Sequence, residues 1–202
     1  MSIRNIIFDL GGVLIDWNPR YVYRSIFDTE EEVEWFLNKI CTMDWNEQQD
    51  RGRSLEEGTR ILQEKYPKWR DQIAAFYGRW VEMLGGPIEE NVKLIRKLKE
   101  ENQYNLFALT NWSAETFPIA EDRYDFLQLF QGIVVSGKEK VIKPESEIYH
   151  LLLNRYGLQA KECLFIDDNK RNILAALKQG IKSIHYTQPT DLSIALKELD
   201  II

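Results

Sequence analysis

Polar side chains that can bind a metal or a phosphate stand directly after three short apolar runs of the sequence. These are Asp9 after residues 3–8, Thr110 and Asn111 after residues 104–109, and the pair Asp167 and Asp168 after residues 163–166. Three carboxylates brought to one point concentrate negative charge that a buried site holds only with a cation. Ligands that are all oxygen favour Mg²⁺ over a transition metal. The residue types therefore predict a magnesium site if the fold brings the three positions together.

The elements around these polar residues predict that the fold does bring them together. Brief apolar runs closed by a polar or glycine turn are typical of buried parallel strands. Five such runs occur, at residues 3–8, 104–109, 132–135, 163–166 and 182–186, and helical patterns lie between them at residues 87–101, 144–156 and 169–179. This alternation predicts an α/β, doubly wound (Rossmann-like) parallel sheet with right-handed crossovers. Ligands of such sheets bind outside the carboxyl ends of the strands, where the polar residues converge.

Residues 16–86 interrupt the alternation of strands and helices. The segment is rich in Trp, poor in β-type runs, and shows helical patterns at residues 31–39, 54–66 and 68–84. Ser54 and Glu57 fit a capping box for the second of these helices, and Glu30-Glu31-Glu32 fits the solvated start of the first. The run Gly85-Gly86-Pro87 is the expected hinge back into the core. We therefore predict a core domain of residues 1–15 and 87–202 with an inserted helical cap domain of residues 16–86.

Length and composition bound the class of protein. The chain has 202 residues, enough for a core domain with a small accessory unit. Its net charge of −6 argues against a protein that binds duplex nucleic acid. The start of the chain lacks the apolar region of a signal peptide, and no run approaches a membrane span. Cys41 and Cys163 are expected to be buried, reduced thiols. These features predict a cytoplasmic monomer or homodimer without nucleic-acid or membrane partners.

Four segments together give the chain a family resemblance. Residues 6–14, which include Asp9, Leu10 and Gly11, resemble the first motif of the haloacid dehalogenase (HAD) superfamily, and residues 109–111 resemble its second. Lys143-Pro144, followed by a helix with Ile148-Tyr149, resembles the third motif, and residues 165–168 with Asn172 resemble the fourth. Their order and spacing agree over almost the whole chain. The insertion after the first motif resembles the helical-cap subfamily, and Asp-Leu-Gly resembles bacterial sugar-1-phosphate phosphatases of that superfamily.

The resemblance implies a role for each acidic residue. Asp9 is the expected nucleophile, which attacks phosphorus and becomes an aspartyl-phosphate. Mg²⁺ is expected to bind the Asp9 carboxylate, the main-chain carbonyl of Gly11, Asp168 and the substrate phosphate. Asp167 is expected to act through a water or by holding another ligand.

The resemblance also implies how the phosphate is held. Thr110 and the main chain of Asn111 are expected to bind phosphoryl oxygens. Lys143 is expected to neutralise the charges of Asp9 and the phosphate, and with Thr110 it completes the predicted catalytic set. These roles agree with the chemistry, because phosphoryl transfer depends mainly on positioning and charge neutralisation.

Gly11 departs from the pattern of the family. Most phosphatases of the superfamily carry a second Asp at this position, which protonates the leaving oxygen and then activates water, and glycine cannot transfer a proton. Three interpretations follow. Another group, for which Asp16 is a candidate, replaces the missing Asp, or the substrate has a good leaving group, as in a sugar-1-phosphate or acyl phosphate. In the third, catalysis is lost. The resemblance to sugar-1-phosphate phosphatases favours an active enzyme.

Further residues are candidates for contact with the substrate. Trp17 and Asn18 are predicted to bind it, and Trp112 and Ser113 flank the second motif. Five residues of the insertion either contact a sugar or pack between helices: Trp45, Asn46, Gln48, Gln49 and Arg51. The two histidines, His150 and His185, fall on a helix and a late strand, where a catalytic role is not expected.

The function that follows is Mg²⁺-dependent hydrolysis of a small phosphorylated metabolite, with a sugar phosphate as one candidate. A 2-haloacid dehalogenase is the alternative enzyme, because it uses the same kind of nucleophile and halide leaves without a proton. It attacks carbon and needs no metal, so the Asp167-Asp168 pair argues against it. A binding module without catalysis is the third interpretation, which the fold alone does not exclude.

Overall fold

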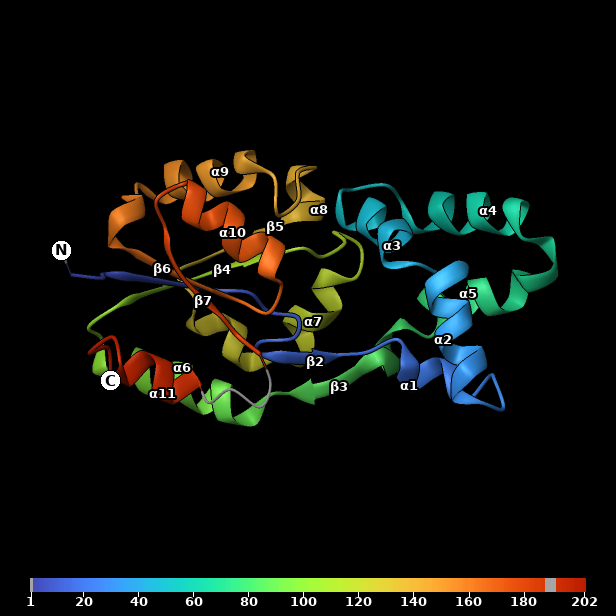
Figure 1. The fold of residues 1–202 in the computed structure, drawn as a ribbon, viewed down its shortest axis with the longest axis horizontal. Coiled ribbons are helices and arrows are strands. Elements are labelled where there is room, and N and C mark those ends of the chain that lie inside the picture. The colour runs from blue at the N-terminus through green and yellow to red at the C-terminus, as the bar shows by residue number, and fades with distance from the viewer. Residues whose placement is uncertain (1, 188–191) are drawn as a thin grey trace.

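A parallel sheet of five strands forms the centre of the molecule, in the order β5-β4-β1-β6-β7 (Figure 1). The computed structural model describes residues 2–187 and 192–202. The strands are β1 (Asn5–Phe8), β4 (Asn105–Thr110), β5 (Gly132–Val135), β6 (Cys163–Asp167) and β7 (Lys182–His185). Phe8 of β1 pairs with Ala108 on one side and Ile166 on the other, so the ends of the three strands are level. The predicted strands and the α/β fold class are confirmed.

Helices cover both faces of this sheet (Figure 1). On one face lie α9 (Ser146–Tyr156) and α10 (Lys170–Lys178), and on the other lie α6 (Glu89–Glu101), α7 (Phe117–Arg123) and α11 (Leu192–Lys197). Successive strand residues point to opposite faces, so Ile7 packs with the first group whereas Ile6 and Phe8 pack with the second. Gly180, with φ +78°, ends α10 as the sequence predicts.

Some short elements of the core were not predicted. They are α7, α11, α8 (Ser136–Glu139) and the 3₁₀ turns η3 (Asp125–Leu129) and η4 (Ala160–Glu162). Helices of one or two turns are too short to be stable by propensity, so tertiary packing decides whether they form. Phe117 and Ala120 of α7, for example, are fully buried against the sheet.

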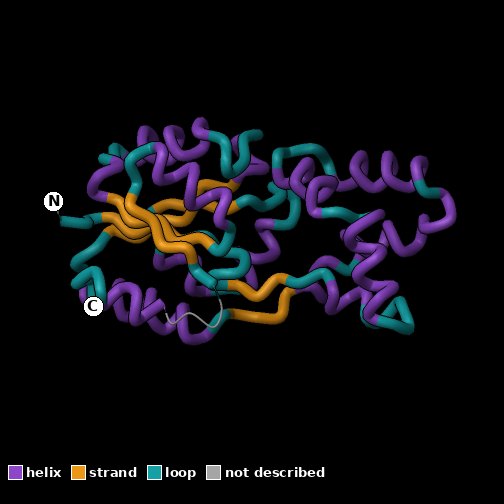
Figure 2. Tube along the Cα trace, viewed as in Figure 1, coloured by secondary structure: helices purple, strands orange, loops and turns teal. Residues whose placement is uncertain are grey.

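Between β2 (Ile15–Trp17) and β3 (Leu84–Pro87) the regular elements are all helices and 3₁₀ turns, which lie together beside the sheet (Figures 1 and 2). They are α1 (Arg20–Tyr23), α2 (Glu30–Lys39), α3 (Met43–Asp50), α4 (Leu55–Lys65), η1 (Pro67–Trp69), α5 (Arg70–Gly78) and η2 (Trp80–Met83). Tyr23, Phe36 and Phe76 are buried at their centre. The prediction of one helix over residues 68–84 is wrong, because the segment divides into η1, α5 and η2.

The helix starts in this unit follow from their caps. The Thr29 hydroxyl accepts a bond from the Glu32 N–H while the Glu32 carboxylate accepts from the Thr29 N–H, so α2 begins with a complete capping box. Ser54 caps α4 by accepting from the Glu57 N–H at 3.2 Å. The missed helix α3 begins at Thr42, whose hydroxyl accepts from the Trp45 N–H at 3.2 Å.

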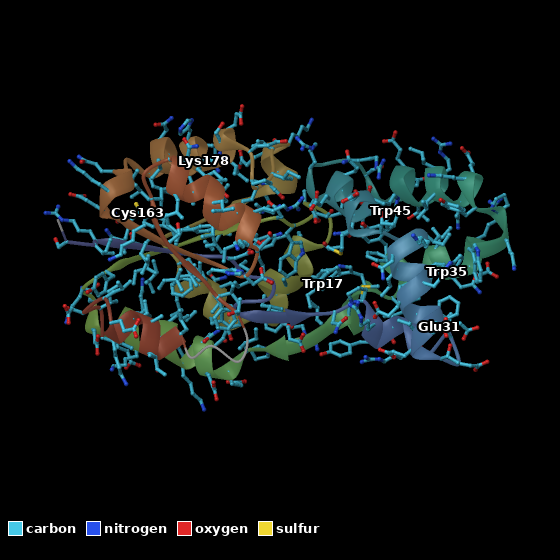
Figure 3. The ribbon with its side chains drawn as sticks, viewed as in Figure 1. Trp17, Glu31, Trp35, Trp45, Cys163 and Lys178 are labelled. Carbon is cyan, nitrogen blue, oxygen red and sulfur yellow. The ribbon has the colours of Figure 1, made fainter. Side chains whose placement is uncertain are left out.

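A two-stranded antiparallel ribbon joins the helical unit to the sheet. It pairs β2 (Ile15–Trp17) with β3 (Leu84–Pro87), so the expected hinge at Gly85-Gly86-Pro87 is itself a strand. A Cβ at Gly85 would lie 2.2 Å from the Asp16 carboxylate, so glycine permits this close pairing. Figure 3 shows Trp17, at the end of β2, where the sheet meets the helical unit.

Two further expectations concern the chain as a whole. Cys41 and Cys163 are free and buried, as predicted. None of the helices in the described ranges combines the length and apolar character that crossing a membrane requires.

Candidate functional site

A cavity of about 620 Å³ lies where the carboxyl ends of β1, β4, β6 and β7 face the helical unit. From the core it is lined by Asp9, Gly11, Gly12, Asn111, Trp112, Ser113, Thr116, Asp168, Asn169, Lys170, Asn172 and His185. From the ribbon and the helical unit it is lined by Trp17, Met43, Asn46, Glu47, Asp50, Tyr77 and Trp80. The convergence predicted for the strand ends therefore occurs.

Asp9, Lys143 and Asp167 form a buried charge cluster next to the cavity. The Lys143 Nζ atom lies 2.8 Å from Asp9 Oδ2 and 2.7 Å from Asp167 Oδ2. Lys143 is 1% exposed and Asp167 is fully buried. Burial works against the charge of the ammonium, but attraction to Asp167 and Asp9 raises the pKa of Lys143 above its usual value. The lysine is therefore a permanent cation between two carboxylates.

The second motif holds this lysine in place. The Asn111 side chain accepts a bond from the Lys143 N–H at 2.8 Å and donates one to the Lys143 carbonyl at 2.9 Å. Its amide is thus used on the main chain of Lys143, which leaves the main chain of Asn111 as the part of this residue that can bind a phosphate. Thr110 precedes Asn111 as the last residue of β4, and it is 1% exposed.

Asp167 is fully occupied within the protein. Besides Lys143, its carboxylate accepts bonds from the Asn169 N–H at 2.7 Å and from the Asn172 amide at 3.0 Å. Asn172, the residue that follows the fourth motif, thus acts on Asp167. Of the two routes expected for Asp167, the contacts favour the one in which it holds another residue, Lys143, in position.

Asp168 completes the acidic cluster on the cavity side. Carboxylate oxygens of Asp9, Asp167 and Asp168 lie within 4.8 Å of one another. Burial raises the pKa of Asp9 well above its usual range, and Asp167 and Asp168 raise it further, against the opposing effect of Lys143. Burial and repulsion from Asp167 likewise raise the pKa of Asp168. Three carboxyl groups thus lie together, and among the residues described Lys143 is the cation paired with two of them.

The donors fit Mg²⁺. They are carboxylate oxygens and the main chain of Gly11, all hard ligands, and Asp168 forms no salt bridge among the residues described. Gly12 leaves room for the Asp168 carboxylate, because a Cβ at Gly12 would lie 2.2 Å from Asp168 Oδ2. Gly12 also has φ +72°, a conformation that favours glycine.

We expect Gly12→Ala to weaken Mg²⁺ binding about 10- to 100-fold, because the new methyl displaces the Asp168 carboxylate. Isothermal titration with MgCl₂ measures the effect. Gly11→Ala is the matched control, since a Cβ at Gly11 meets no atom within 4 Å and its loss of affinity is expected to be much smaller. Equal losses in both variants would show that the position of Asp168 does not determine binding.

Aromatic side chains form much of the remaining wall. Trp17, Tyr77, Trp80 and Trp112 line the cavity, and Trp80 contacts Trp112 edge to face with ring centroids 5.6 Å apart. Trp17, Trp112 and Ser113 therefore lie at the cavity, and contact between Trp17 and a substrate stays a prediction. Such rings offer an apolar platform for the part of a substrate beyond its phosphate.

Several candidates lie elsewhere. Asn18 is not at the cavity, because its side chain accepts a bond from the Arg20 N–H at 3.0 Å at the start of α1. The Trp45 indole N–H donates to the Gly58 carbonyl, and the Gln49 amide donates to the Trp45 carbonyl and to Tyr77. Both residues therefore pack inside the helical unit. Gln48 and His150 are exposed away from the site. Of the five insertion residues, only Asn46 lines the cavity.

Ion pairs fix α3 against the core. Arg51, which follows α3, forms a two-pronged pair with Glu145, and Arg171 Nη2 lies 2.8 Å from the Glu47 carboxylate. The Ser136 hydroxyl donates to the Asp50 carbonyl at 2.6 Å. Arg51 is thus a structural contact between the helical unit and the core, and these contacts hold the carboxylates of α3 at the cavity.

Sequence reasoning missed five ionisable residues of the cavity: Glu47, Asp50, Tyr77, Lys170 and His185. His185 Nε2 donates to the Asp168 carbonyl at 2.9 Å, so it supports the main chain next to the acidic cluster. Its place at the end of β7 was the available signal. By contrast, Asp16 lies outside the cavity lining and accepts a 2.5 Å bond from the Tyr21 hydroxyl.

Comparison with known proteins adds family and fold. A family model for haloacid dehalogenase-like hydrolases matches residues 3–180. A sesquiterpene phosphatase of Aspergillus oryzae is 29% identical over 199 residues, which cover 98% of this chain and 97% of the relative. A phosphorylated carbohydrates phosphatase of Thermotoga maritima is 26% identical, with 89% and 83% covered. The magnesium complex of a HAD family enzyme of Bacteroides thetaiotaomicron is similar in fold, with a TM-score of 0.76 and 23% identity. The match covers 98% of this chain and 100% of that enzyme's chain.

Proposed function

Because the chain belongs to the haloacid dehalogenase-like hydrolase family, we propose that it is a Mg²⁺-dependent phosphatase that acts on a small phosphorylated substrate through an aspartyl-phosphate on Asp9. The observation that carries the proposal is the cluster of Asp9, Asp167 and Asp168 with Lys143 at the cavity. Phosphatases among the relatives, from Aspergillus oryzae and Thermotoga maritima, support the reaction class.

Each residue of the cluster has a task in this reaction. Asp9 lines the cavity, and one oxygen of its carboxylate attacks phosphorus. Lys143 offsets the charge of Asp9 and of the incoming phosphate, while Asp167 and Asn111 hold the lysine in place. The main chain of Asn111 and the Thr110 hydroxyl bind phosphoryl oxygens. Asp9, Asp168 and the Gly11 carbonyl would hold Mg²⁺, which would supply neutralisation of negative charge.

The dehalogenase alternative fits this cluster less well. A nucleophile that attacks carbon needs no metal, and Asp168 would then stand beside Asp9 with no cation to offset it. Burial is the main cause of the raised pKa of both carboxyl groups, and the neighbouring carboxylates raise it further. A module without catalysis would have no use for a lysine buried between two carboxylates, which is costly to retain.

We also propose that residues 16–86 act as a cap domain on a core of residues 1–15 and 87–202. Trp17, Tyr77 and Trp80 come from this segment and close the cavity opposite Asp9. A cap of this kind excludes water from the intermediate and selects the substrate. The aromatic wall suits a sugar ring or another partly apolar group, and a sugar phosphate is the first candidate to assay.

We expect hydrolysis of 4-nitrophenyl phosphate to require Mg²⁺ and to stop with EDTA. Mg²⁺ at about 100 times its Kd stabilises the fold by about 2.7 kcal/mol, which raises Tm by roughly 5–10 °C in a protein of this size. Thermal unfolding with and without MgCl₂ measures this, and Asp168→Asn should remove most of the rise.

Asp44→Asn is the matched control for that experiment, because Asp44 is an exposed carboxylate on α3 and should leave the rise unchanged. Turnover of 2-chloropropionate in EDTA, with none of phosphate esters, would overturn the proposal in favour of the dehalogenase.

A further inference from the structure

Asp50 is a carboxyl group of the cavity for which the proposed reaction has so far no use. It is the last residue of α3 and lines the same cavity as Asp9 and Asp168. We propose that Asp50 is the general acid that protonates the leaving group and the general base that activates water. This inference rests on the proposed phosphatase activity and adds the proton carrier that Gly11 cannot be.

The reaction needs such a carrier at two points. As the Asp9 oxygen bonds to phosphorus, the bond from phosphorus to the leaving oxygen breaks, its electron pair stays on that oxygen, and Asp50 donates its proton there. A water oxygen then bonds to phosphorus while Asp50 takes a proton from the water and the bond to Asp9 breaks. Asp9 returns as a carboxylate, Asp50 returns protonated, and the products are an alcohol and phosphate.

The other acidic side chains of the cavity are committed elsewhere. Asp9 is the nucleophile and Asp168 faces the metal site. The Glu47 carboxylate is paired with Arg171. On the remaining walls, the Tyr77 hydroxyl donates to the side-chain oxygen of Asn46 and accepts from the Gln49 amide, and His185 donates to the main chain of Asp168. Asp50 is the carboxyl group that these contacts leave available to a leaving group.

The position of Asp50 is built rather than incidental. The Asn46 amide donates to its carboxylate at 2.9 Å, and the Ser136 hydroxyl fixes its main-chain carbonyl at 2.6 Å. Helix α3 is pinned to the core by the Arg51 and Glu47 ion pairs described above. An acid must be held within reach of the leaving oxygen, and these contacts hold Asp50 on the cavity wall.

The surroundings of Asp50 raise its pKa into the neutral range. Burial raises the pKa of Asp50 to about 7, repulsion from Glu47 adds to this, and the main-chain N–H of Ser113 opposes it. A further ionisable group that interacts with Asp50 is Tyr77 on α5. A carboxyl group of this kind can both give and take a proton at pH 7.

The test compares kcat/KM for an activated aryl ester, 4-nitrophenyl phosphate, with that for an alkyl ester, glycerol 2-phosphate. The kcat/KM value reports the attack of Asp9 alone, and nitrophenolate leaves without a proton. Asp50→Asn should lower kcat/KM for the alkyl ester about 100-fold or more, and that for the aryl ester less than about 5-fold. In the wild type, the ratio of alkyl to aryl kcat/KM should fall as the pH rises above about 7. This falling limb of the pH profile should be absent in Asp50→Asn.

Two further variants make the result specific. Asp16→Asn removes the rival carboxyl outside the cavity and should leave the ratio unchanged. Gly11→Asp adds a carboxyl at a position where a Cβ meets no atom within 4 Å, and in the Asp50→Asn background it should restore part of the alkyl activity. If Asp50 had only a structural role, Asp50→Asn would lower kcat/KM for both esters together, and Gly11→Asp would not restore the alkyl activity.

A second half-reaction provides an independent readout. Without its base, Asp50→Asn should accumulate the aspartyl-phosphate and show a burst of nitrophenolate equal to the enzyme concentration. Circular dichroism and Asp50→Glu, which keeps the carboxyl, separate misfolding from lost chemistry. An unchanged alkyl-to-aryl ratio in folded Asp50→Asn, or a pH limb that moves with His185→Gln instead, would overturn the role of Asp50. Failure of the wild type on every phosphate ester would overturn the phosphatase itself.

Discussion

Asp9→Asn is expected to lower turnover by about 10⁴-fold or more while the fold stays intact, because asparagine keeps the size of the side chain but lacks the attacking carboxylate. Initial rates with 4-nitrophenyl phosphate at saturating Mg²⁺ measure the loss, and circular dichroism checks the fold. Turnover near that of the wild type would show that the catalytic assignment is wrong, whatever the fold.

The same variant should gain stability without metal at high pH. The folded protein raises the pKa of Asp9, so it binds this proton more tightly than the unfolded chain does. Stability is therefore highest below the unfolded pKa of about 4 and falls as the pH rises through the folded value. Asp9→Asn removes this loss. In urea unfolding in EDTA, the free energy of unfolding of the variant should therefore exceed that of the wild type by more at pH 8 than at pH 5.

Lys143→Met is expected to destabilise the protein by about 3–5 kcal/mol and to abolish turnover. The substitution keeps an unbranched side chain but leaves the buried carboxylates of Asp9 and Asp167 without their shared cation. Urea unfolding at pH 7 measures the loss. Stability should recover as the pH is lowered, because the unpaired carboxylates then take up protons.

Two comparisons isolate the charge in that experiment. Lys97→Met removes a lysine that is 57% exposed, and should change stability by less than about 0.5 kcal/mol. The double variant Lys143→Met with Asp167→Asn should regain part of the lost stability, since it removes one of the uncompensated charges. A Lys143→Met protein as stable as the wild type would show that the buried cation does not hold the cluster together.

The sheet and its acidic edge could be predicted because local chemistry and global fold agree there. Strands such as β1 and β6 are buried throughout and mainly apolar, as burial on both faces requires, and an Asp at the carboxyl end of each marks the edge. Lys143 carries no such local signal, since a buried lysine looks like a surface lysine in sequence. Only the resemblance of its motif located it.

The cap side of the cavity could not be predicted for the opposite reason. Helix α3 has no clear apolar face, because its buried residues include Asn46 and Gln49. The Gln49 amide donates to the Trp45 carbonyl, and the Asn46 side-chain oxygen accepts from the Tyr77 hydroxyl. Patterns of apolar residues fail where polar groups are buried for a function. For the same reason Trp45 and Arg51 suggested sugar contacts, although the first packs inside the unit and the second pairs with Glu145.

The closed network at the sheet edge has a consequence for how such enzymes diversify. Asn111, Lys143 and Asp167 use their polar groups on one another, so in the proposed reaction they would meet the phosphate end of any ester in the same way. What distinguishes one ester from another would lie beyond the phosphate, toward Tyr77 and Trp80 in the inserted segment. Reactivity and selectivity would then be encoded in separate stretches of chain, and the second could change through mutation without disturbing the first.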